Sequence, residues 1–381
     1  MTETDTFKVE IDPKLLKWAI DSAGWKKEEL IKALVISEKV FDGWLSGSVN
    51  PTIKQLEDIS KKTKRPLASF FLPKPPIETP NPKDYRMLPD KKDVFERKTL
   101  FAIRKARYLQ EISNELSLNM NKNLKLNLKR VTISDNPQEI AEKHRELLNL
   151  TIERQEKFKS KSHEFYNYLR DVIEDFNVLS FQISMPIKDA RGFALADKDP
   201  MIIVVNSADD IKPRIFTLIH ELGHILLGKT SIDIPSLENQ DAIEKWCNDF
   251  SAAFLMPRQL LVRIFEDYKS KLTDGKILNY ISNKYNISKS MFLFNLTKNN
   301  CISTQNYKNF LNAVYKEEKK KPSSGGGGQK QDIKCVSTLG KKFISLVADN
   351  LEKEQITTND ALSYLSIKSR NLDKVISRAG K

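Results

Sequence analysis

Residues 214–228, RIFTLIHELGHILLG, set two histidines four positions apart in a stretch that is otherwise mostly apolar. On an α-helix such residues share one face, so His220 and His224 would direct both imidazoles toward one point. Two neutral nitrogen ligands hold a zinc ion in this way. Glu221 lies about 100° around the helix from His220, beside the metal, as the base that takes a proton from metal-bound water. The stretch therefore predicts a helix that carries a hydrolytic zinc site.

The same stretch also fits a second interpretation, a buried amphipathic helix whose histidines make ordinary hydrogen bonds. The chain has only four histidines among 381 residues, and a chance H-E-x-x-H is then on the order of one in a few hundred. In either case the helix should open at Pro213 and end at Gly228. Gly223 should let another element approach it closely. A third ligand would favour the metal site.

The helix predicted next, in DAIEKWCNDFSAAFLMP (241–257), offers such a ligand. Glu244 and Asn248 are four residues apart and share one face of it. Glu244 could bind the metal while Asn248 reaches the second nitrogen of a histidine and fixes its tautomer. A lone helix carboxylate is more often simply solvated, so the residues alone leave this ligand open. The other two histidines, His144 and His163, have no spacing that suits a ligand.

The surrounding segment alternates helical and β patterns. We expect amphipathic helices at 136–150 and 162–176. Short β-rich runs follow at 178–184, 191–197 and 201–207, bounded by Pro, Asp and Gly. The last run, MIIVVN, is either an edge strand that pairs with an extended substrate or an ordinary core strand. The predicted fold class is therefore α+β and mostly helical, with the metal site on a helix beside a small sheet.

Residues 11–72 are predicted to form a bundle of short helices, with Ser37 as the N-cap of the third. Helix, short helix, tight link, helix, helix is the helix-turn-helix order. The helix after the tight link presents Glu38, Lys39 and Asp42, and it has no Arg, Asn or Gln suited to bidentate base contacts. We therefore expect the bundle either to bind DNA or to use the same fold to dock a protein.

The net charge of +13 is unevenly distributed. Residues 1–78 carry +1 and residues 259–381 carry +11, so the basic charge lies mainly in the C-terminal third. Such a surface suits a nucleic acid or is simply solvated. The three cysteines are few and widely spaced, no apolar run is long enough to cross a bilayer, and the start has no signal-peptide pattern. We therefore expect a cytoplasmic protein with free thiols.

Two breaks in composition divide the chain. The segment 70–86 is rich in proline, and 316–331 is a charge run followed by Pro, Ser and four glycines. The expected parts are a helix-turn-helix domain at 1–75, a connector at 76–129, a core with the zinc site at 130–258, a helix-turn-helix-like module at 259–315, a flexible tether at 316–332 and a small helical module at 333–381.

Two resemblances extend these expectations. Trp18, EELIKAL, Trp44, NPTIKQLEDISK and RPLASFFLPKPP together resemble the Cro/repressor-type (XRE) helix-turn-helix, in the version that precedes ImmA/IrrE-family zinc proteases. ARGFALADKDPMIIVVN, RIFTLIHELGHILLG and EKWCNDFSAAFLMP resemble the gluzincin-like core of the ImmA/IrrE family, in the same order.

The second resemblance implies roles for single residues. It makes His220, His224 and Glu244 the zinc ligands and Glu221 the catalytic glutamate. Cys247 and Ser251 stand where the family usually has alanine. Because both side chains are small, the helix that carries them should still pack.

The implied function is that of a zinc-dependent regulatory endopeptidase that cleaves a protein target, a transcriptional repressor or an antitoxin. The alternative is a helix-turn-helix DNA-binding regulator with a structural or silent zinc site, or a protein that works by binding alone. DNA is a further expected partner through residues 1–75, and a membrane is not. Arg191, Arg214 and Tyr166 are candidates for stabilising the oxyanion, and each also fits a structural role.

Overall fold

A computed structural model describes residues 7–76, 95–233, 242–268, 271–272, 274–318 and 330–380. The chain forms two compact units, one made of residues 1–81 and 92–105 and the other of residues 82–91 and 106–381. Most of the proline-rich segment, at 77–94, and of the tether, at 319–329, lies outside the described residues. The finer division into six parts stays a prediction. In the described part, no helix combines the length and apolar character that a membrane span requires.

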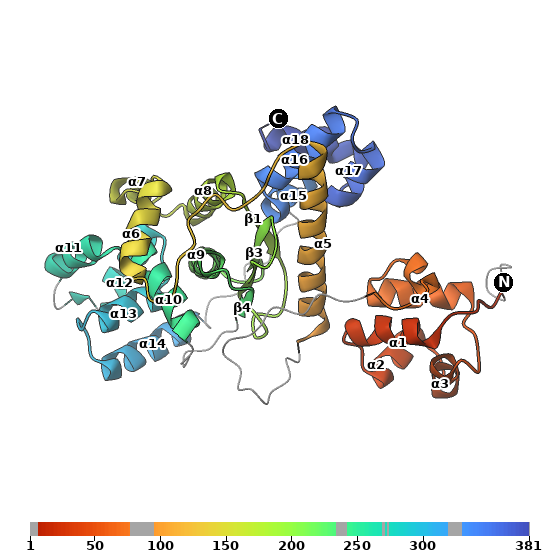
Figure 1. The fold of residues 1–381 in the computed structure, drawn as a ribbon. Coiled ribbons are helices and arrows are strands. Elements are labelled where there is room, and N and C mark those ends of the chain that lie inside the picture. Colours follow the sequence, from red (N-terminus) through yellow and green to blue (C-terminus); the bar gives the residue numbers. More distant parts are fainter. Residues whose placement is uncertain are drawn as a thin grey trace. The chain divides into compact units, whose positions relative to one another are not determined.

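The first unit is a bundle of helices, drawn in red to orange in Figure 1. Its elements are α1 (Pro13–Ser22), α2 (Lys27–Leu34), α3 (Glu38–Ser46), α4 (Ile53–Thr63), the 3-10 helix η2 (Leu67–Phe71) and the first part of α5 (Arg97–Asn119). The predicted cap at Ser37 is confirmed, because its hydroxyl accepts the amide of Val40 at 3.3 Å. The bundle closes over a core that includes Leu16, Trp44 and Leu56.

The second unit contains a four-stranded mixed sheet in the order β1-β3-β2-β4. Its strands are β1 (Val178–Ile183), β2 (Gly192–Leu195), β3 (Met201–Asn206) and β4 (Ser231–Asp233). β1 and β3 run parallel, whereas β2 is antiparallel to both of its neighbours. β3 is therefore hydrogen-bonded on both sides and wholly buried, which its continuous apolar run suits. The edge-strand interpretation of MIIVVN is wrong, and the core-strand alternative is confirmed.

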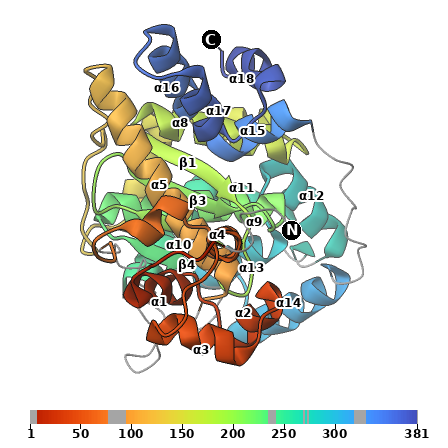
Figure 2. The same cartoon turned by 90° about the vertical axis from the view of Figure 1, so that its right-hand side faces the viewer.

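Helices surround this sheet, which confirms the mostly helical α+β fold (Figure 2). They are α6 (Pro137–Leu147), α7 (Ile152–Lys157), α8 (Ser162–Asp175), α9 (Ile211–Leu227), α10 (Ala242–Leu255), α11 (Arg258–Tyr268), α12 (Gly275–Tyr285), α13 (Lys289–Lys298), α14 (Thr304–Glu318), α15 (Gln331–Leu339), α16 (Lys341–Glu352), α17 (Thr358–Leu365), the 3-10 helix η4 (Ser369–Asn371) and α18 (Leu372–Arg378). α8 and α9 pack against each other and against the sheet, and α10 packs against α9 and α6. One apolar core joins these elements to α11, α12 and α13.

The C-terminal helices are fastened to the sheet by a buried polar junction. α15 lies against the edge strand β1. Arg170 and Glu174 on α8 form a buried ion pair at 3.1 Å. Arg170 donates to the Ser337 carbonyl near the end of α15 at 2.6 Å, and Glu174 accepts the Lys342 amide at the start of α16 at 3.1 Å. Removing one partner of such a pair typically costs about 3–5 kcal/mol, so the junction holds residues 330–380 to the second unit.

Candidate metal centre

Helix α9 carries the two histidines and ends at Gly228, which adopts a left-handed conformation with φ 68°. The predicted end is therefore confirmed. The helix begins at Ile211, two residues before the predicted start at Pro213, because proline is tolerated in a first turn whose amides lack intrahelical acceptors. Residues 217–226 are all buried. The end of α9 is held further by Arg130, whose guanidinium donates to the Ile225 carbonyl.

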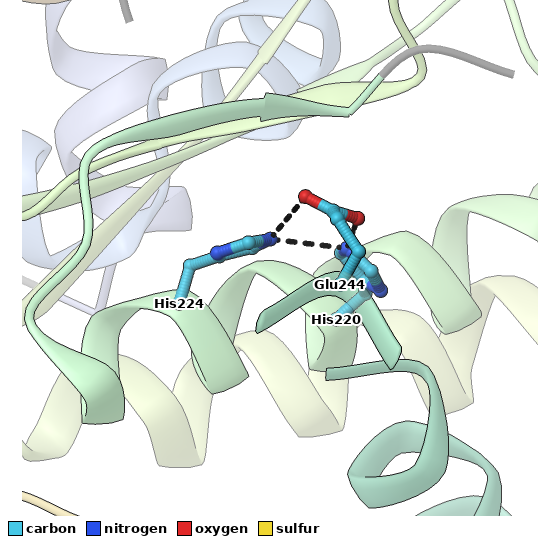
Figure 3. A group of neighbouring side chains, drawn as sticks. All are labelled: His220, His224 and Glu244. Atoms are coloured by element: carbon cyan, nitrogen blue, oxygen red, sulfur yellow. Dashed lines mark hydrogen bonds and ion pairs between the residues drawn. The ribbon is translucent and has the colours of Figure 1, made fainter. Parts of the chain in front are cut away.

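The structure brings three predicted ligands together (Figure 3). His220 and His224 project from the same side of α9, and their Nε2 atoms are 3.2 Å apart. The Glu244 side chain reaches from α10 to both histidines. Its Oε2 lies 3.2 Å from Nε2 of His220, and its Oε1 lies 3.2 Å from Nε2 of His224. All three residues are fully buried. Because three buried side chains from two helices converge, the group forms one compact set of donor atoms.

These donors fit a zinc ion. A tetrahedral zinc site with bonds of about 2.0–2.1 Å separates its ligand atoms by about 3.4 Å. The separations of 3.2 Å differ little from that value, so one ion could lie among the three after small shifts. Burial raises the pKa of Glu244, but hydrogen bonds from His220 and His224 outweigh this effect and hold it well below its ordinary value. Glu244 is therefore an anion, the state in which a carboxylate binds a metal.

Glu221 lies beside this group and is not part of it. It is fully buried on α9, and the backbone of β2 passes directly over it. A Cβ atom on Gly192 would lie 3.2 Å from Oε1 of Glu221, 2.5 Å from Cγ2 of Thr217 and 2.8 Å from the Val204 carbonyl. Gly192 thus leaves the space that the Glu221 carboxylate needs. Gly192 is not among the residues predicted from the sequence, although an isolated glycine in a strand signals a close approach.

The close approach expected at Gly223 is confirmed, and the approaching element is α10. A Cβ atom on Gly223 would lie 3.1 Å from Sγ of Cys247 and 3.4 Å from Cδ1 of Phe250. Trp246 stacks on Phe250 with a centroid distance of 5.4 Å and an interplanar angle of 9°. The stack lies within α10, so the contacts of Gly223 with Cys247 and Phe250 are the ones that set the distance between α9 and α10. They therefore also set how far Glu244 reaches toward the histidines.

The sequence predicts that Asn248 bonds the second nitrogen of one of the two histidines, and at His220 it does not. It lies half-buried on α10. The Nδ1 atom of His220 is buried and has no hydrogen-bond partner among the residues that the structure describes. The other two histidines lie outside this group. Nδ1 of His144 is hydrogen-bonded to the Ile140 carbonyl on α6 at 2.7 Å, and His163 lies on α8.

The three candidates for stabilising an oxyanion take part in other contacts. Arg191 pairs with Asp209 at 2.5 Å. Arg214 donates to the side chain of Gln182 at 2.7 Å. Tyr166 is buried in the apolar core, and this burial raises its pKa. The structural alternative named for each residue is therefore the one that its contacts favour.

Two histidines on one helix, a glutamate from the next helix and a second glutamate beside them define a metal-binding domain of the H-E-x-x-H class. Residues 173–297 match the family model described as the IrrE N-terminal-like domain, peptidase family M78. Over these residues the chain is therefore similar to that family.

A relative shares part of this region. The radiation response metalloprotease IrrE of Deinococcus radiodurans is 32% identical over 109 residues, which are 27% of this chain and 32% of that protein. The chain thus covers about a third of the length of this relative.

Proposed function

We propose that the chain is a zinc-dependent regulatory endopeptidase that hydrolyses a peptide bond in a protein target. The observation that carries this proposal is the buried group of His220, His224 and Glu244 with Glu221 next to it. The match of residues 173–297 to a peptidase family supports the same conclusion. The name of the relative, a metalloprotease, supports a metal-dependent reaction.

In this proposal each polar residue of the site has one task. His220, His224 and Glu244 would hold the ion. When bound, zinc acts as a Lewis acid that makes water nucleophilic at neutral pH and polarises the carbonyl of the scissile bond. Glu221 takes the proton from the attacking water at its carboxylate and passes it to the leaving amine. The apolar side chains around α9 exclude bulk water, which strengthens these electrostatic interactions.

The sheet suggests where an extended substrate would lie. The edge at β1 is covered by α15, so β4 is the edge that remains in the described sheet. Asp233 of β4 pairs with Gly192 of β2, the residue that lies over Glu221. We propose that a peptide adds to the outer side of β4, where main-chain hydrogen bonds would align it along the site.

We further propose that the target is a transcriptional repressor or an antitoxin, in the cytoplasm. This rests on the resemblance of the chain to the ImmA/IrrE proteases and on the helical bundle at residues 1–75, which is expected to localise the enzyme on DNA or on a protein. The alternative is a DNA-binding regulator whose zinc site is structural or silent. Such a site would have no need of Glu221, and this disfavours it.

The variant Glu221→Gln tests the proposal, because it keeps the shape of the side chain and removes the base. We expect about one zinc per chain in both proteins and a loss of cleavage of roughly 10²–10⁴-fold in the variant. Glu142→Gln, an exposed change on α6, is the matched control and should leave cleavage unchanged.

A proteome comparison of cells carrying wild-type protein or Glu221→Gln would then identify the target as a protein that disappears only with the wild type. Wild-type protein that holds no zinc after purification without chelator would refute the proposal. A Glu221→Gln variant with an intact cellular phenotype would instead favour the binding role.

A further inference from the structure

Among the described residues, a tight turn that ends in isoleucine joins two helices at three places. In each, the residue after the first helix is left-handed, and an isoleucine follows whose amide donates to the carbonyl five residues earlier. The turns follow α2 with Val35 and Ile36, α12 with Asn286 and Ile287, and α17 with Ser366 and Ile367. Such a left-handed cap satisfies the carbonyls at the end of the first helix and turns the chain sharply. Each turn thus changes the chain direction within a few residues, before α3, α13, and η4 with α18 respectively.

The second helix can contact a partner only if one of its faces is free. α13 is apolar nearly all round and is buried at Met291, Phe292, Leu293 and Leu296. It belongs to the main core and packs against α12 and α14. A helix enclosed in this way cannot enter a groove of a nucleic acid, so this turn serves the core.

α3 has an exposed face, but its charge is unfavourable for DNA. Glu38 and Asp42 lie on it, and Lys27 of α2 pairs with both, at 2.8 Å and 2.7 Å. Glu28 and Glu29 add carboxylates at the start of α2. The four lysines at α2 and α3, namely Lys26, Lys27, Lys32 and Lys39, are matched by these four carboxylates. The two helices therefore carry no net positive charge to attract the phosphates of DNA.

The exposed charge on η4 and α18 is mainly positive and favours DNA. Lys368, Arg370 and Lys374 are all exposed. Among the described residues, none of these three side chains has an ion pair or a hydrogen bond, whereas Arg378 is held by Asp332 at 2.6 Å. Asp373 is the one carboxylate between Lys368 and Lys374. In Figures 1 and 2 α18 lies at the outer end of the C-terminal helices, beside the C-terminus.

We propose that this cationic segment, defined by the exposed side chains of Lys368, Arg370 and Lys374, binds the phosphates of duplex DNA. The positive charge and the free donors supply the electrostatic attraction. A projecting helix fits the major groove of B-form DNA, whereas the major groove of double-stranded RNA is too narrow for side chains to read. DNA contact, expected at residues 1–75 from the sequence, is thus assigned to the other end of the chain.

The test measures binding of the full chain to a fluorescent duplex of arbitrary sequence, about two helical turns long, as salt is raised from about 50 mM. The triple variant K368Q/R370Q/K374Q removes the three charges of the cationic segment. Since each neutralised phosphate contributes about 0.9 to the slope of log K against log salt, the variant should lose up to about 2.7 of that slope and at least about tenfold in affinity at low salt.

The matched control K26Q/K32Q/K39Q removes three exposed lysines at α2 and α3 and should change neither quantity. Hydrogen exchange over α15–α18 checks that the first variant is folded. The proposal is overturned if wild type does not bind the duplex, if both variants lose affinity equally, or if single-stranded RNA competes as well as the duplex. The assay reads binding and not cleavage, so its outcome is independent of the proposed peptidase.

Discussion

The contact between Gly223 and Cys247 should control how well the two helices of the metal centre fit together. An alanine at 223 would place its Cβ atom 3.1 Å from Sγ of Cys247, closer than ordinary van der Waals contact. Its other neighbours, the Cβ atom of Cys247 and Cδ1 of Phe250, would be 3.4 Å away, which is acceptable. The sulfur alone therefore makes the substitution unfavourable.

The magnitude follows from two opposing terms. Replacing glycine by alanine inside a helix stabilises by about 1 kcal/mol. Overpacking a buried contact costs about 1–3 kcal/mol. Gly223→Ala should therefore lower the free energy of unfolding by about 0–2 kcal/mol. With Cys247→Ala already present the overpacking disappears, and the same substitution should raise the free energy of unfolding by up to about 1 kcal/mol.

The difference between these two effects is a coupling of about 1–3 kcal/mol, within the range found for residues in contact. Hydrogen exchange of α9 and α10 amides gives the opening free energies in wild type, both single variants and the double variant. Zinc affinity, measured against a competing chelator, should fall in Gly223→Ala and recover in the double variant, because α10 carries Glu244. If Gly223→Ala costs as much in the Cys247→Ala background as in the wild type, the sulfur contact does not set the helix spacing.

Three further predictions address other parts of the second unit. Glu244→Ala should lower zinc affinity by more than the roughly 10–100-fold that outer-shell partners are worth, measured by chelator competition, and an unchanged affinity would exclude Glu244 as a ligand. Burial lowers the pKa of His144 from 6.5, so the unfolded chain binds more protons below that pH and the free energy of unfolding falls as the pH drops. His144→Gln should make the free energy of unfolding in urea depend less on pH. The same pH dependence in variant and wild type would contradict the assignment. Gly340 has φ +79°, and a Cβ atom there would clash with Oε1 of Glu174. Gly340→Ala should therefore lower the free energy of unfolding by more than about 3 kcal/mol and expose the amides of 330–380 to hydrogen exchange. Retained protection of these amides would show that the junction tolerates a side chain.

The metal centre was predictable to the extent that its geometry is local. His220 and His224 share one helix, so their spacing alone fixes that they face one point. Glu244 comes from a different helix, and only the family resemblance selected it among many carboxylates. Gly192 was missed because its importance lies in the close approach of β2 to Glu221 on α9, and nothing in the spacing of the two residues shows that contact.

Strand order was the other feature that the sequence left undetermined. The β-rich runs were located correctly, because a run of buried apolar residues is a local property. Which strand becomes central depends on which neighbours it finds, and β3 lies between β1 and β2, both of which precede it in the chain. The open edge consequently falls to β4, a three-residue strand that follows the metal-binding helix and has too few residues to show a periodic pattern.

Arg170 and Glu174 show most clearly why long-range packing resists prediction. Four residues apart on an amphipathic helix, they have the spacing of an ordinary solvated ion pair. In the fold both are buried, because α15 ends at the guanidinium and α16 starts at the carboxylate. Docking of residues 330–380 therefore both buries the pair and supplies the carbonyl and the amide that satisfy it, and removing one charge would leave the other buried and unpaired. An ion pair that looks solvated on its own helix is thus part of the contact that joins the C-terminal helices to the second unit.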